Sequence, residues 1–146
     1  MLKQYRIMEV REIMQQALLK GACSNSNGVS DWKTLCWLFF TPQGIEFCEN
    51  NKFPTLGTFR LIADKVKDFN VFVDSGKIKR NNDTNIALVG ETDAELVFDD
   101  NTKVHKVIVM HGAKVFIIAR NYAVVRLINI DGNVNIHSDK TSVILK

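Results

Sequence analysis

The second half of the chain repeats a pair of short apolar runs at a nearly constant spacing, and this repeat constrains the fold more than any other feature. Written from Gly76, successive segments are 18, 19 and 20 residues long, and each holds two Val- and Ile-rich runs separated by a polar corner. A period near 20 with two strands per period is typical of a solenoid, in which each coil buries its apolar side only by stacking on its neighbours. The sequence therefore predicts a β-solenoid.

The repeat also predicts which residues stack on each other. One series of equivalent positions is Ile78, Leu96, Val115 and Val134, and a second, spaced by 18 residues, is Val107, Val125 and Val143. The alternative is an antiparallel β-sandwich or meander, because strands recurring about every 9 or 10 residues also describe that class. The scarcity of hairpin-type turns, with Asp131-Gly132 as the exception, favours the solenoid.

The first part of the chain shows helical periodicity. Apolar residues at steps of three and four indicate an amphipathic helix over 5–20, and capping signals predict shorter helices over 31–40, after Pro42, and from Thr55 to about Val66. Ser30 is the expected N-cap of the second helix, and Thr41 that of the third. The predicted fold class is α+β: an α-helical segment, 1–68, that can cap the first coil, then a β-solenoid of three to four coils, 69–146.

Two stretches carry a resemblance to a known group of proteins. The run DNTKVHKVIVMHGAKVFIIARNYAVV and, upstream, TPQGIEFCENNKFPTLGTFR resemble short proteins from gut-bacterial and phage or mobile-element genomes, which repeat small and β-branched residues with Asn or Gly at half-coil spacing. The resemblance implies a helical segment followed by a degenerate solenoid, and it implies no particular activity.

The distribution of charge bears on whether the chain binds nucleic acid. The net charge of +3 is evenly spread, with nine Lys/Arg against eight Asp/Glu in residues 1–75 and ten against eight in residues 76–146. Binding to nucleic acid usually needs concentrated positive charge, so this balance disfavours it. The alternative that remains is a nucleic-acid-binding regulator using a helix pair over 43–66, with Thr55, Thr58 and Arg60 near the start of its second helix.

Candidate catalytic and metal-binding groups are sparse. His105 and His111 are separated by six residues of strand, about 20 Å, too far to share one metal ion, and we expect them to be surface or edge histidines. Asp99, Asp100, Glu91 and Asp93 fall at expected corners, where a small glycan-directed enzyme could place two carboxylates but where Asp also simply forms turns. We therefore expect no enzyme, no cofactor and no metal.

The three cysteines, Cys23, Cys36 and Cys48, form no metal or redox motif, and we expect reduced thiols that are part of the packing. With no apolar run near the length of a membrane span, the expected location is the cytoplasm, or a virion if the chain derives from a phage.

The function predicted from these patterns is a non-enzymatic structural or protein-interaction module that can associate with itself. Its partner is a protein, which can be a second copy of the chain, and no membrane is involved. The partner-binding residues we expect are on the aromatic helix and the last strand: Trp32, Trp37, Phe40, Val143 and Leu145.

Overall fold

The computed structural model describes residues 8–22 and 29–146. The chain divides into two compact units, Met1–Phe69 and Asn70–Lys146. In the described residues the first unit is helical and the second is a parallel β-solenoid of about four turns, which confirms the predicted fold class. The proposal that the helices cap the first coil stays a prediction.

The helical unit follows its capping residues. Its elements are α1 (Val10–Leu19), α2 (Trp32–Phe39), α3 (Pro42–Asn51), α4 (Leu56–Val66) and a short 3₁₀ turn, η2 (Lys67–Phe69). Thr41 and Thr55 cap α3 and α4 by accepting hydrogen bonds from the backbone N–H groups of Gly44 and Thr58. The prediction of Ser30 as the cap of α2 is wrong, because the carboxylate of Asp31 accepts from the Thr34 N–H at 2.6 Å. The first part of the helix expected over 5–20 lies outside the described residues.

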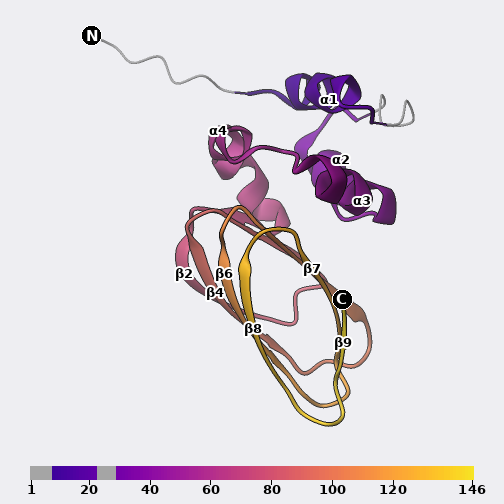
Figure 1. The fold of residues 1–146 in the computed structure, drawn as a ribbon, viewed down its shortest axis with the longest axis vertical. Helices are drawn as coiled ribbons and strands as arrows, with labels where there is room; N and C mark the ends of the chain where they lie inside the picture. Colours follow the sequence, from indigo (N-terminus) through magenta and orange to yellow (C-terminus); the bar gives the residue numbers. More distant parts are fainter. Residues whose placement is uncertain (1–7, 23–28) are drawn as a thin grey trace. The chain divides into compact units, whose positions relative to one another are not determined.

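The solenoid consists of two sheets whose strands alternate along the chain (Figure 1). The five-stranded sheet contains β1 (Val71–Val73), β3 (Asn85–Val89), β5 (Val104–Met110), β7 (Val124–Asn129) and β9 (Val143–Leu145). The four-stranded sheet contains β2 (Gly76–Asn81), β4 (Thr92–Phe98), β6 (Lys114–Ala119) and β8 (Asn133–Ser138). Every described strand pair is parallel, so the antiparallel alternative is wrong.

The register of the coils differs from the predicted one. Paired residues are 16 positions apart between the first two coils (Gly76 with Thr92), then 21 (Asp93 with Lys114) and 19 (Lys114 with Asn133). Ile78 therefore stacks on Ala94 rather than on Leu96. In the five-stranded sheet Val107 pairs with Leu127, Val125 pairs with Ile144, and Val143 pairs with Val124, so the predicted second series does not stack.

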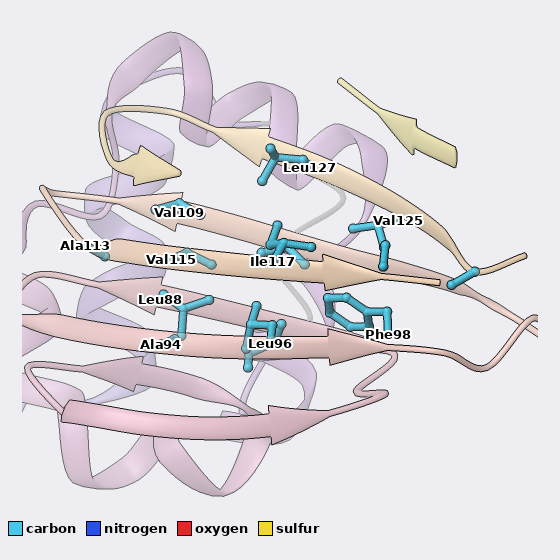
Figure 2. Close-up of a cluster of buried hydrophobic side chains, with 14 residues drawn as sticks. Leu88, Ala94, Leu96, Phe98, Val109, Ala113, Val115, Ile117, Val125 and Leu127 are labelled. Carbon is cyan, nitrogen blue, oxygen red and sulfur yellow. The ribbon is translucent and has the colours of Figure 1, made fainter. Parts of the chain in front are cut away.

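Inward-facing side chains from both sheets form the solenoid core (Figure 2). Leu96 and Ile117 occupy one inward row of the four-stranded sheet, and Leu88 and Val109 occupy one of the five-stranded sheet; all four are at most 1% exposed. On the outer side of the four-stranded sheet, Lys77, Asp93 and Lys114 alternate in charge along one row, which suits a solvated surface. The two faces of this sheet thus follow the inside–outside alternation of its strands.

Gly132 is required by close approach at the corner between β7 and β8. A Cβ atom there would lie 2.8 Å from the carbonyl oxygen of Ala113 and closer still to Cγ1 of Val109. Asp131-Gly132 does not form a hairpin turn. It connects β7 to β8, which belong to different sheets.

We expect Ile117→Ala to lower the free energy of unfolding of the solenoid by about 2–5 kcal/mol, because it leaves a cavity in a fully buried row. The control is Phe116→Ala, one residue away on the same strand but 41% exposed, for which we expect a change below about 1 kcal/mol. Urea unfolding of both variants measures the difference. Equal losses for the two variants would contradict the assignment of inward and outward residues.

Candidate functional site at the edge of the last coil

The last coil has an unpaired side. Among the described strands, β8 pairs only with β6, and β9 pairs only with β7, so one side of each is without a neighbour. An unpaired strand presents a row of N–H and C=O groups that can pair with another chain. We call the open sides of β8 and β9, together with the inward-facing side chains of Val134, Ile136 and Ile144, the last-coil edge.

The backbone bonds identify which groups face outwards from the stack. The N–H of Asn133 donates to Ala113, and the N–H of Val143 donates to Ala123, so these residues point their backbone groups toward the preceding coil. Successive residues of a strand alternate in this direction. The N–H and C=O groups of Val134, Ile136 and Ile144 therefore point to the open side.

The inward rows of the core end at this edge with apolar side chains. Ile136 continues the row of Leu96 and Ile117, and Ile144 continues the row of His105 and Val125. Val134, Ile136 and Ile144 pack against the core but are only half-buried. The residues that precede them in the same rows are almost fully buried, because a further coil covers them. Covering the last coil would likewise remove apolar surface from water.

The first coil also has unpaired sides, on β1 and β2, but its inward row ends with a charged residue instead of an apolar one. Arg80 occupies the position in the row that Leu96, Ile117 and Ile136 occupy in later coils. Its guanidinium lies over the Phe72 ring, 5.3 Å from the centroid, and donates two hydrogen bonds of 2.9 Å to the carboxylate of Asp83. Hydrogen bonding to Asp83 raises the pKa of Arg80 further. An ion-paired cation thus closes the apolar interior at one end of the solenoid.

The five predicted partner-binding residues belong to two different units of the chain. Val143 and Leu145 are 47% and 48% exposed on the outer face of β9, beside the last-coil edge. Trp37 is 65% exposed on α2, and Trp32 is half-buried. Phe40 is buried at 5% exposure with its ring edge-on to Phe39, and its role in partner binding stays a prediction.

The acidic residues at the corners serve the turns. The carboxylate of Asp100 accepts from both the N–H and the hydroxyl of Thr102, and these bonds lower its pKa. Asp99 accepts from the Asn82 side chain and lies 3.7 Å from the guanidinium of Arg120. Asp93 is not at a corner, since it lies within β4. In the described part of the chain, no group of three or more His, Cys, Asp and Glu side chains could hold a metal ion.

Both His105 and His111 were expected at the surface or at an edge. His105 is completely buried, so its prediction as a surface or edge histidine is wrong; the side chain of His111 is only partly exposed.

In the helix pair 43–66, Thr55 and Thr58 hydrogen-bond each other at the start of α4, and Thr58 is buried. These two threonines are therefore engaged in capping and packing.

Comparison with known proteins gives no match: no protein-family model, no curated protein and no solved structure is significantly similar to the chain. The comparisons thus contain no support for a gut-bacterial or phage origin, which stays a prediction. None of the helices formed by residues 8–22 and 29–146 has the length and apolar character needed to cross a membrane.

Cys36 and Cys48 are buried free thiols, and burial raises the pKa of each to about 12, with the charge of Glu49 adding to the effect at Cys48. The thiolate is the reactive form, so we expect neither residue to react with iodoacetamide in the folded protein at about pH 8. Peptide mass spectrometry after native and denaturing labelling measures this. Rapid native modification of either residue would contradict its placement. Cys23 lies outside the described residues.

Proposed function

We propose that the protein is a non-enzymatic interaction module that associates with a second copy of itself through the last-coil edge. The observation that carries the proposal is the difference between the two ends of the stack. The same inward row begins with the ion-paired Arg80 and ends with the apolar, half-buried Ile136. Charged side chains that point inward on edge strands prevent strand addition, whereas apolar edges favour it.

A second copy is the occupant that suits this edge. Neither β8 nor β9 contains an Asp, Glu, Lys or Arg, so no fixed charges on these strands oppose the approach of two identical edges. A two-fold contact would pair the edge strands antiparallel, and the inward side chains of both copies would meet in one continuous core. The outward Val143 and Leu145 would then lie next to uncharged side chains of the partner's edge strand.

The first coil limits this assembly to a dimer. Lys77, Lys79 and Arg80 all lie on β2, the edge strand of the four-stranded sheet in the first coil. A head-to-tail stack would have to bury Arg80 and Asp83 under the apolar last coil, which costs several kcal/mol for charges taken out of water. A tail-to-tail contact avoids this cost and closes after two copies.

No observation favours the two alternatives, a nucleic-acid-binding regulator and a glycan-directed enzyme. A phage or mobile-element role, and a location in the cytoplasm or a virion, also stay predictions. Trp32 and Trp37 are a separate predicted contact for a protein partner.

We expect sedimentation equilibrium of the full chain to show a monomer–dimer equilibrium. Ile136→Arg, which places a cation at the row position of Arg80, should weaken dimerisation at least tenfold, about 1.4 kcal/mol or more. The matched control is Phe116→Arg, with the same change of charge on the exposed face of β6, one strand from the edge. Circular dichroism checks that both variants fold.

Three outcomes would overturn the proposal: a monomer at every concentration, equal dimerisation of wild type and Ile136→Arg, or equal loss in both variants. Growth beyond a dimer would refute the role given to Arg80 in closing the first coil.

A further inference from the structure

His105 is a polar residue at an apolar position of the solenoid core. It is the first inward-facing residue of β5, in the row continued by Val125 and Ile144, and its exposed fraction is 0%. Its ring lies 4.7 Å from the ring of Phe98, centroid to centroid. A buried polar side chain is tolerated when its hydrogen-bonding groups are satisfied, so the partners of the two ring nitrogens decide its chemical state.

Both ring nitrogens face backbone carbonyl oxygens. Nδ1 lies 2.9 Å from the oxygen of Asp83, and Nε2 lies 3.0 Å from the oxygen of Asp100. A carbonyl oxygen can only accept a hydrogen bond, and a neutral imidazole has one N–H donor. A neutral ring would therefore leave a nitrogen lone pair directed at one of these oxygens. Only the doubly protonated ring donates to both.

We infer that His105 is held as an imidazolium inside the solenoid, where it joins the corner after β2 to the corner after β4. The two carbonyls belong to successive coils, so the ring ties the coils together at a point outside the strand ladders. Hydrogen bonds from a charged donor are about twice as strong as neutral ones, which offsets part of the cost of burying the charge.

The surroundings are compatible with a positive charge at this position. Hydrogen bonds from the hydroxyl and the N–H of Thr102 lower the pKa of the Asp100 carboxyl, and the backbone carbonyl of the same residue faces Nε2 of His105. The aromatic ring of Phe98, tilted by 38° to the imidazole, is a favourable neighbour for a cation at this distance. The other ionisable groups at these two corners are Asp83 with its partner Arg80, Asp99 with its partner Arg120, and Lys103.

The direct test is ¹⁵N NMR of the histidine side chains in the unchanged full-length chain at about pH 8, above the ordinary histidine range. We expect both ring nitrogens of His105 to give the signals of protonated nitrogen. A neutral tautomer, with one protonated and one bare nitrogen, would overturn the inference. This readout requires no variant and is independent of dimerisation.

Discussion

The parallel hydrogen-bond ladder between successive coils is the constraint on which the rest of the solenoid depends. No coil can satisfy its backbone or bury its inward side chains alone, because the partners of both lie in the coils before and after it. Rows such as Leu96–Ile117 and Leu88–Val109 are dry only because they are stacked. The first and last coils are therefore the ones that have unpaired backbone groups and partly exposed inward side chains. The first coil carries the ion-paired Arg80 at its inward row, and the last coil carries the apolar Ile136.

The corners also depend on contacts between coils, because side chains of one coil form hydrogen bonds with the backbone of a neighbouring coil. The side-chain oxygen of Asn82 accepts from the N–H groups of Asp99 and Asp100, and the amide of Asn121 donates to the Asp99 carbonyl oxygen. His105 extends this pattern from the corner into the core. Interactions between coils are thus distributed over ladders, rows and corners, which explains why acidic corner residues serve the structure.

The fold class was predictable from the sequence, but the register was not. Strand residues alternate between inward and outward, so a slip of two residues leaves the hydrophobic pattern unchanged. Leu96 and Ala94 both face inward, and only the structure shows that Ala94 is the partner of Ile78. The coils also differ in length, because the corner between β4 and β5 is longer than the one between β2 and β3.

The candidate site was predictable only in part. Val143 and Leu145 were predicted from the sequence as partner-binding residues, but their outward direction, and the role of Ile136 and Ile144, depend on that register. The burial of His105 had a readable signal, since it shares the inward phase of Val107 and Val109 along β5. The carbonyl partners of its ring come from corners 22 and 5 residues away, and no sequence pattern indicates them.

Residue-resolved amide hydrogen exchange, in dilute and in concentrated solution, tests the central claim most directly. In dilute solution the N–H groups of Ile136 and Ile144 should exchange rapidly, while those of Asn133 and Val143, which bond to the preceding coil, should be protected. At high concentration the account predicts new protection at Ile136 and Ile144. Rapid exchange of both at every concentration, or new protection confined to α2, would contradict it.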